Sequence, residues 1–275
     1  MSLAARLSAI AIAIATAAAL APAIALAAAP VPALAPGFAL VDPQVSPPHA
    51  YVAGEPVRIA FGFAAPAPLG LQVEIVREAN GTPVVTTVLP AAAPGEPQIV
   101  AWDGLRGSGA VAPQGSYRVR VRGPGGSARL AGRVTLRTHI YPVRGTHADR
   151  GPIGRFGVGR SGGRTHEGFD IDAACGTPLA AARGGRVVSV RYDPVLYGNL
   201  VIIRGAHTRR DYWYAHLQRP SRLRAGDDVL TGRRIGRVGA TGNARTIGCH
   251  LHFEIRSRGV PIDPEPELHH WDRWS

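Results

Sequence analysis

Short runs in which apolar and polar residues alternate follow one another along this 275-residue chain, and they limit its possible folds more than any other feature. In "YRVRVR" (117–122) the tyrosine and both valines fall on one face and the three arginines on the other, which is the period of a half-buried β-strand. The 34 glycines and 24 prolines indicate frequent turns between such runs. The runs before residue 139 cover 56–64, 71–78, 82–89, 98–104, 116–123 and 128–138.

Closely spaced strands of this kind, in about 100 residues, predict a β-sandwich over 38–138. The composition changes at about residue 139, because nine of the ten histidines and both cysteines follow that point. We see no amphipathic helix pattern longer than two turns there, and we expect a second, all-β or nearly all-β domain over 139–275. Its strand-like runs cover 185–193, 199–205, 211–217 and 251–257.

The first 27 residues have the layout of a secretory signal peptide. One early cation, Arg6, precedes a charge-free Ala/Ile/Leu run that ends in small residues near Ala27. Because this run is about 20 residues long, an uncleaved membrane anchor is the alternative, although Pro22 interrupts it. Residues 28–37 are rich in Ala and Pro, and we expect a tether there. The protein is therefore expected to be secreted or held in the cell envelope.

The formal net charge is +12, and all 31 basic residues are arginine. This charge predicts attraction to polyanions such as nucleic acids, acidic membranes or an anionic cell wall. We see no stripe of arginines with interleaved aromatic residues, so we do not expect nucleic acid as a partner. The expected partner is an anionic cell wall surface, because it agrees with both the leader and the positive charge. A membrane is expected as a partner only if the leader is not cleaved.

Two histidines stand one residue apart in "GCHLHFE" (248–254). Residues two apart in a strand point to the same face, so His250 and His252 present two imidazoles side by side. Two surface histidines would look the same, and this pair alone is weak evidence for a metal.

A second and a third histidine-bearing element strengthen the case for a metal. In "GGRTHEGFDID" (162–172), His166 and Asp170 stand four apart with a glycine between them, so an imidazole and a carboxylate can converge. His216 follows in the aromatic run "YWYAHL" (212–217). A surface ion pair and a packed histidine are the ordinary explanations for each element alone. Two histidines and one aspartate are a sound donor set for Zn²⁺, and three protein ligands leave a fourth position for water.

These motifs occur in a fixed order: "HEGFDIDAACGTPLAA", "YGNLVII", "YAHL" and "GCHLHFE". They closely resemble the lysostaphin/LytM-type zinc metalloendopeptidases of peptidase family M23, over about residues 140–265. The resemblance implies a small antiparallel-β peptidase domain with its site in a groove, acting on peptides of bacterial peptidoglycan. Carried onto matching positions, it implies one Zn²⁺ per chain held by His166, Asp170 and His252, with His216 and His250 as catalytic residues. The division of labour between the two catalytic histidines stays open.

The N-terminal sandwich carries a resemblance of its own. The string "WDGLRGSGAVAPQGSYRVRV" (102–121) resembles the late strands of bacterial immunoglobulin-like modules of the flagellar-hook-cap type. The expected all-β architecture is thus an N-terminal immunoglobulin-like β-sandwich, followed by the peptidase domain. A small sandwich of this kind is more often a spacer or binding module than an enzyme, and His49, its one histidine, is expected at the surface.

Cys175 and Cys249 lie next to the two metal-binding motifs. A secreted chain with two cysteines most often pairs them, so we favour a disulfide. The alternative is a thiolate ligand, but strand parity turns Cys249 away from His250 and His252.

Other residues near the motifs have minor predicted roles. Glu254 falls on the face of His252 and is expected to accept a hydrogen bond from a ligand histidine, not to act as the general base. Arg160 and Arg245 are candidates to meet a stem-peptide carboxylate, although a solvated arginine is the ordinary reading of each. The tail 264–275, with His269 and His270, is expected to be a surface segment without a metal. Glycine-rich loops at 154–163, 191–198 and 239–248 are expected to shape the groove.

Three functions remain open from the sequence. The first is a secreted zinc endopeptidase that hydrolyses cross-bridge or stem peptides of peptidoglycan. The second is a non-catalytic wall-binding or amidase-activating regulator that retains the fold, which the complete ligand set disfavours. The third is an adhesion protein in which zinc only stabilises the structure, which an open coordination position disfavours.

Overall fold

The computed structural model describes residues 38–275 apart from residue 127. The predicted signal peptide (1–27) and tether (28–37) lie outside the described residues. Among the described residues, no helix combines the length and the apolar character that crossing a bilayer requires.

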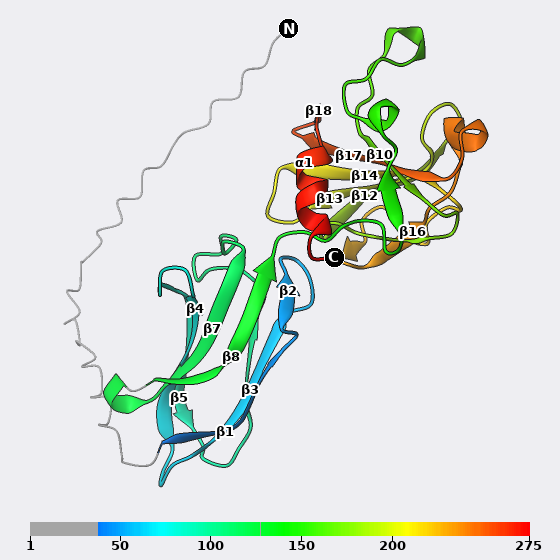
Figure 1. The fold of residues 1–275 in the computed structure, drawn as a ribbon. Helices are drawn as coiled ribbons and strands as arrows, with labels where there is room; N and C mark the ends of the chain where they lie inside the picture. Colours follow the sequence, from blue (N-terminus) through cyan, green and yellow to red (C-terminus); the bar gives the residue numbers. More distant parts are fainter. Residues whose placement is uncertain (1–37, 127) are drawn as a thin grey trace, which may run out of the picture. The chain divides into compact units, whose positions relative to one another are not determined.

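Two sheets are formed by the strands before residue 138 (Figure 1). One has the strand order β1-β3-β6 and the other β2-β8-β7-β4-β5. Every pair is antiparallel except β2 with β8, which run parallel. The strands are β1 (Ala39–Ser46), β2 (His49–Tyr51), β3 (Val57–Ala64), β4 (Leu69–Arg77), β5 (Pro83–Ala92), β6 (Gln98–Trp102), β7 (Gly115–Arg122) and β8 (Ala128–Arg137).

The two-residue period decides which side chains of these strands are buried. In β7, Tyr117, Val119 and Val121 are fully buried, whereas the arginines between them are partly exposed. Apolar residues of both sheets form one continuous core, so the two sheets enclose it between them. The six predicted runs coincide with β3 to β8 to within about three residues at each end. The all-β class is confirmed, and His49 is exposed as expected.

The remaining strands form a large antiparallel sheet with the order β15-β12-β13-β14-β17-β10-β9, and β18 pairs with β17. A separate two-stranded sheet joins β11 and β16. β17 lies between β14 and β10, so the strand with two histidines adjoins the strand that holds His216 and the strand that holds Asp170. The strands are β9 (His147–Asp149), β10 (Phe169–Ala173), β11 (Pro178–Ala180), β12 (Gly185–Asp193), β13 (Gly198–Gly205), β14 (Arg210–Leu217), β15 (Asp228–Val229), β16 (Arg234–Arg237), β17 (His250–Ser257) and β18 (Val260–Ile262).

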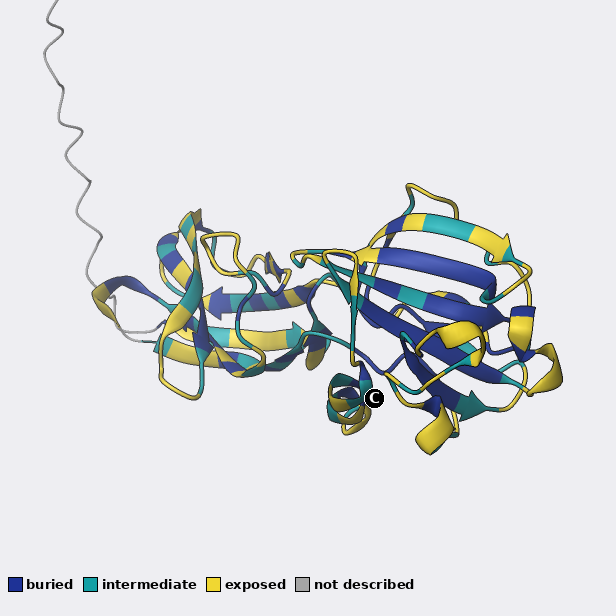
Figure 2. Ribbon diagram, turned by 90° about the horizontal axis from the view of Figure 1, so that it is seen from above, coloured by how far each residue is buried: buried dark blue, intermediate teal, exposed yellow. Residues whose placement is uncertain are grey.

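The central strands of this sheet are buried along most of their length. Figure 2 shows dark blue, buried residues filling the middle strands, while exposed residues gather in loops and at edges. Short 3-10 helices interrupt the loops at η1 (Pro124–Gly126), η2 (Pro152–Gly154), η3 (Ser161–Gly163) and η4 (Gly242–Thr246).

The prediction for the C-terminal tail was wrong in one respect. Residues Glu265–Asp272 form the helix α1, and Leu268 and Trp271 on it are buried in the core of the large sheet. His269 is exposed, as expected of a surface segment. The helix has only two turns and two prolines at its start. Apolar residues cannot recur often enough in so short a helix for the helical period to be recognised in the sequence.

Candidate metal centre

The strand pairing of β10 with β17 builds the centre of the site. Asp170 lies directly opposite His252 in this antiparallel pair. As strand parity predicted, Leu251 and Phe253 are buried in the apolar core, and His250 and His252 point to the other face. Because directly opposed residues have close Cβ atoms, the register alone brings one carboxylate and one imidazole together.

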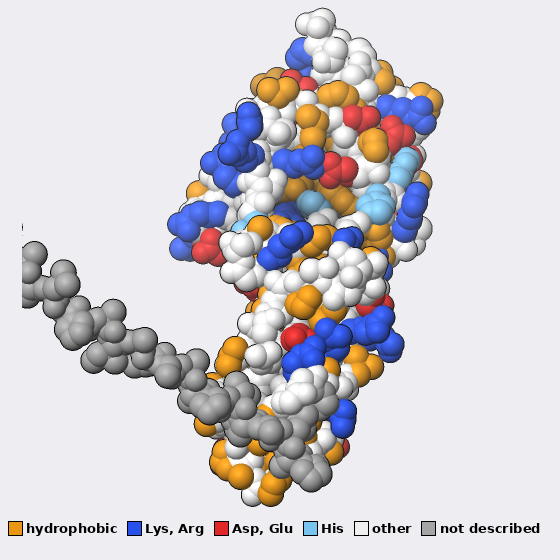
Figure 3. Space-filling model, turned by 90° about the vertical axis from the view of Figure 1, so that its left-hand side faces the viewer, with side chains coloured by type: hydrophobic (Ala, Val, Ile, Leu, Met, Phe, Trp, Pro, Cys, Tyr) orange, Lys and Arg blue, Asp and Glu red, His pale blue; other side chains and the backbone are white. Residues whose placement is uncertain are grey.

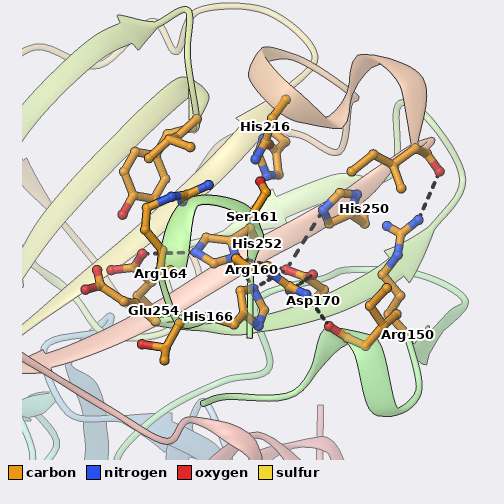
Figure 4. A pocket seen from close by; sticks show the side chains of 18 residues that line it. Arg150, Arg160, Ser161, Arg164, His166, Asp170, His216, His250, His252 and Glu254 are labelled. Atoms are coloured by element: carbon orange, nitrogen blue, oxygen red, sulfur yellow. Dashed lines mark hydrogen bonds and ion pairs between the residues drawn. The ribbon is translucent and has the colours of Figure 1, made fainter. Parts of the chain in front are cut away.

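Three predicted side chains converge on one point (Figure 4). Nε2 of His166 lies 3.0 Å from Oδ1 of Asp170 and 2.9 Å from Nδ1 of His252, and that Nδ1 lies 2.9 Å from the same Oδ1. All three residues are buried. Ligands on a tetrahedral zinc with bonds of ~2.0–2.1 Å lie ~3.3 Å apart, so a small outward movement of these atoms would admit the ion.

The outer contacts of the two histidines decide which ring nitrogens carry hydrogen. Nδ1 of His166 lies 2.8 Å from the carbonyl oxygen of Arg155, which can only accept, so this nitrogen is the donor. Nε2 of His252 lies 3.0 Å from a carboxylate oxygen of Glu254 and donates to it. When a cation takes the place of the hydrogen on the remaining nitrogen of each ring, that nitrogen turns its lone pair toward the same point as the carboxylate of Asp170. Two lone pairs and a carboxylate that face one another fit a cation, and an N, N, O set suits zinc.

The charges within this cluster are strongly coupled. Burial opposes ionisation of Asp170, but its hydrogen bonds with His166 and His252 outweigh burial and hold its pKa far below the usual range. Burial also disfavours a charged His252, yet its hydrogen bonds to Asp170 and Glu254 raise its pKa to about 9. Without a metal, this ring is held protonated between two carboxylates. A bound cation would replace that proton.

His216 reaches the site through an unusual backbone conformation. Tyr212 and Tyr214, on the same side of β14 by parity, are packed in the apolar core. His216 has φ of 61°, in the left-handed region that non-glycine residues seldom adopt. Its ring lies 4.7 Å from that of His250 and 5.8 Å from that of His252, measured between centroids. The local change of direction places His216 with the site histidines instead of in the core.

His216 and His250 are both held in one tautomer by backbone carbonyls. Nδ1 of His216 donates to Thr241 O at 2.8 Å, and Nδ1 of His250 donates to Gly248 O at 2.9 Å. Burial lowers the pKa of His216 to about 3, and burial also lowers the pKa of His250. Both rings are thus neutral at pH 7, with Nε2 as the nitrogen that can accept a proton; Nε2 of His250 lies 3.9 Å from Oδ1 of Asp170.

A cleft of about 770 Å³ gives access to this centre. Its lining includes all five predicted site residues, and members of each of the three glycine-rich loops that were expected to shape a groove. Arg160 lies in the cleft, but its Nη2 is 3.3 Å from Oδ2 of Asp170, so it also buttresses that carboxylate. Arg245 is not among the lining residues; its Nη2 donates to the hydroxyl of Tyr192.

The predicted disulfide is confirmed. Cys175 and Cys249 are bonded, with their Cα atoms 5.3 Å apart. The disulfide joins the segment after β10 to the residue before β17, and so it ties together the two segments that carry the candidate metal ligands.

Several contributors gave no local signal in the sequence. The carbonyls of Arg155, Thr241 and Gly248 are backbone atoms that any residue supplies, and Arg150, which lines the cleft, lies outside every motif. The face shared by His252 and Glu254 did predict their hydrogen bond, and that expectation is confirmed.

Asp149, Glu265 and His269 form a second group whose potential ligand atoms lie within 4.8 Å of one another. These side chains are partly or fully exposed, and Glu265 also faces Arg155 at 3.5 Å. We interpret this group as a surface ion-pair network.

Comparison with known proteins places the site within a family. Residues 164–264 match the family described as Peptidase family M23. Over 124 residues the chain is 40% identical to the lipoprotein NlpD/LppB homolog of Pseudomonas aeruginosa. This aligned region covers 45% of this chain and 37% of that protein. It is 42% identical over 101 residues to the DD-carboxypeptidase/endopeptidase Mpg of Neisseria meningitidis, and 39% identical over 101 residues to the peptidoglycan DD-endopeptidase ShyC of Vibrio cholerae. Each of these two alignments covers 37% of this chain and 22% of the relative. The chain therefore spans between about a fifth and two fifths of the length of these relatives.

Proposed function

Residues 164–264 form a peptidase family M23 domain, a kind of zinc metallopeptidase, and from this premise we propose that the chain is an extracytoplasmic enzyme that hydrolyses peptide bonds of peptidoglycan. The observation that carries the proposal is the convergence of two ring nitrogens and one carboxylate oxygen, beside two neutral histidines in an open cleft. Relatives whose names include peptidoglycan DD-endopeptidase support the substrate class.

In this proposal His166, Asp170 and His252 hold one zinc ion, and His216 and His250 are catalytic. Bound zinc supplies a Lewis acid that can lower the pKa of a water from ~15.7 to ~7 and polarise a carbonyl. Nε2 of a neutral His216 or His250 can accept the proton that the attacking water loses. The protonated ring can then stabilise the oxyanion or donate to the leaving amine. Water and one peptide bond thus become a carboxylate and an amine.

The proposal also concerns location and domain organisation. We propose that residues 1–27 export the chain, that 28–37 form a tether, and that 38–138 form a module separate from the peptidase domain at 139–275. In this scheme the immunoglobulin-like module positions the peptidase domain near its substrate.

The positive charge supports binding to an anionic wall. A second cleft, of about 910 Å³, has one carboxylate, Asp227, in its lining and five exposed arginines: Arg219, Arg222, Arg233, Arg234 and Arg237. Among the described residues, no carboxylate forms an ion pair with any of these five. Arginine side chains, drawn blue in Figure 3, also outnumber the acidic ones, drawn red, on the face shown there. We propose that this second cleft, the arginine cleft, contributes to wall binding.

The test combines zinc analysis with mass spectrometry of fragments released from isolated peptidoglycan. We expect about one zinc per chain, release of fragments with newly cleaved peptide bonds, and loss of release with a chelator. His250→Ala should retain zinc and stop release, because His250 is not a ligand in this proposal. His49→Ala, an exposed histidine, serves as the matched control. A native protein that holds zinc and binds the wall, but never releases a fragment, would instead support the regulator.

A further inference from the structure

A chain of charged side chains lies behind the ring of His252, on the side away from Asp170. Glu254 is fully buried, with 0% of its surface exposed. One of its carboxylate oxygens accepts the hydrogen bond from Nε2 of His252 at 3.0 Å, and the other accepts a hydrogen bond from Nε of Arg256 at 2.6 Å. Both oxygens of this buried carboxylate are therefore used, one by a proposed zinc ligand and one by a cation.

The same guanidinium also reaches the first metal-binding segment. Nη2 of Arg256 donates to a carboxylate oxygen of Glu167 at 2.5 Å, and Glu167 is the neighbour of His166 in the chain. The guanidinium lies over the ring of Trp213, 4.1 Å from its centroid. The planar fork of arginine contacts two carboxylates through separate N–H groups while its face lies on the aromatic ring, a fixed geometry that a flexible ammonium group does not impose.

Arg256 thus connects the residues next to two proposed ligands. On β17 it binds Glu254, which binds His252, and in the loop before β10 it binds Glu167 beside His166. These two segments are separated by more than eighty positions in the sequence. A zinc centre requires their side chains to meet within about 0.5 Å of a fixed geometry.

We propose that Glu254 and Arg256 are positioning residues of the zinc centre. Glu254 holds His252 in the tautomer and ring orientation that present the Nδ1 lone pair to His166 and Asp170. Arg256 fixes Glu254 and fastens the His166 segment to β17 through Glu167. This inference deepens the proposed function and rests on it, because it assigns a role toward the zinc that His166, Asp170 and His252 are proposed to hold.

Glu254→Gln is the most direct test, because it changes one atom and preserves shape. A carboxylate accepts from His252 and from Arg256 together, whereas a carboxamide offers one acceptor oxygen and a donor nitrogen. One of the two hydrogen bonds must therefore be lost. We expect zinc affinity, measured by competition with a fluorescent chelator, to fall about 10–100-fold. Glu267→Gln is the matched control, since Glu267 on α1 pairs with Arg210 on β14 at 2.5 Å and contacts no site residue. Its zinc affinity should equal that of the native protein.

A spectroscopic readout separates positioning from a general loss of stability. Nitrogen-15 spectra of the histidine rings in the zinc-loaded native protein should show His252 with hydrogen on Nε2. In Glu254→Gln this ring should show a mixture of tautomers or a shifted Nε2 signal, while the signals of His216 and His250 stay in place.

Two further variants test the contacts that Arg256 makes with Glu254 and Glu167. Arg256→Lys keeps the charge but cannot bind both carboxylates with one planar group, so zinc affinity should fall by less than in Glu254→Gln. Glu167→Gln should reduce it least, because that side chain is 46% exposed and water can replace the lost contact. This exposed position also leaves a testable variant if the buried substitution prevents folding.

Unchanged zinc affinity and an unchanged His252 spectrum in Glu254→Gln would overturn the inference. So would equal losses in Glu254→Gln and Glu267→Gln. None of these measurements requires substrate. A native protein that binds zinc through the His166 segment and β17, but never cleaves peptidoglycan, would refute the proposed function and leave this inference standing.

Discussion

Gly168 lies where the loop of the first metal-binding motif passes β17. A Cβ atom at this position would come within 2.5 Å of the carbonyl oxygen of Phe253 and 2.8 Å of Cε1 of His252. Backbone cannot move aside cheaply, so Gly168→Ala should displace the loop, cost about 1–3 kcal/mol of unfolding free energy, and weaken zinc binding. Urea unfolding and chelator competition measure the two effects.

Gly159 provides the control for this substitution in the same loop region. A Cβ there would meet nothing within 4 Å, and its φ is not in the left-handed region. Gly159→Ala should change stability by less than about 0.5 kcal/mol. Equal zinc affinity in the two variants would show that the close approach at Gly168 is not needed for the site.

His139 predicts how stability depends on pH at a position away from the proposed ligands. Its ring stacks on Trp271 with centroids 4.3 Å apart, and its Nε2 lies 2.7 Å from the hydroxyl of Tyr212. Burial, with the nearby charges of Arg183 and Arg210, lowers its pKa to about 3. Between about pH 6.5 and pH 3 the unfolded chain binds a proton that the folded chain does not, so unfolding free energy should fall as pH falls.

The contribution of this one ring is isolated by His139→Gln, because the buried rings of His216 and His250, whose pKa values are also lowered, act in the same direction. Up to about 1.4 kcal/mol is lost per pH unit per histidine in this window. Denaturant midpoints between pH 7 and pH 4 should therefore decline less steeply in the variant. Parallel curves for the two proteins would contradict the assignment.

At the scale of single residues, the sequence predicted the five side chains that the structure brings together in the candidate site, but not how His216 reaches it. Strand parity was enough to place His250, His252 and Glu254 on one face, because β17 is a regular strand. Parity alone would put His216 with Tyr214 in the core. The positive φ that redirects it is a property of the folded backbone and has no signature in the residue itself.

The disulfide is the covalent link between the elements of the site. Cys175 and Cys249 are 74 positions apart, and closing a loop of that size is worth about 4 kcal/mol in the chain-entropy model. A double Cys→Ser variant should lose about this much unfolding free energy, measured by urea titration under non-reducing conditions. If the variant and the native protein unfold at the same urea concentration, the bridge does not contribute to stability.

The helix α1 covers part of the core beneath β17. Trp271 is 2% exposed and meets Phe253 edge to face, with centroids 6.3 Å apart. Trp271→Ala should cost about 3–5 kcal/mol, since it leaves a cavity against this strand. Arg273→Ala, an exposed position on the turn after the helix, is the control and should change stability little. A comparable loss in both variants would mean that the helix does not support the core.

Across the whole molecule, long alternating or apolar runs were predictable and short elements were not. The strand β12 was predicted at its observed bounds, 185–193, because its run is flanked by glycine and turn residues. β11, β15 and β16 have two to four residues each, too few to show a period. Asp170, His250 and His252 were predictable because they lie on regular strands, whereas His166 lies in the loop before β10. The walls of the cleft come from loops, whose course depends on tertiary contacts.

The arginine cleft yields a prediction that belongs to the molecule as a whole. Charge reversal at Arg219, Arg222 and Arg233 changes the net charge by six units while leaving every proposed catalytic and ligand residue in place. Binding to isolated peptidoglycan should weaken, and its dependence on salt should become shallower, because fewer counterions are exchanged when fewer cations meet the polymer. Sedimentation with the wall at several salt concentrations measures both quantities.

Reversing Arg58, Arg77 and Arg129 provides a control of equal charge, since none of these three lines the arginine cleft. If net charge alone governs association, the two triple variants should lose binding equally, and the cleft has no special role. If the cleft is the contact surface, only the first variant should bind weakly at physiological salt. Both should still hydrolyse small soluble wall peptides at the native rate, because such substrates need the cleft that contains the proposed zinc centre (the zinc cleft) but no anchorage to the polymer. A loss of hydrolysis in the first variant alone would mean instead that the arginines act on the zinc cleft itself.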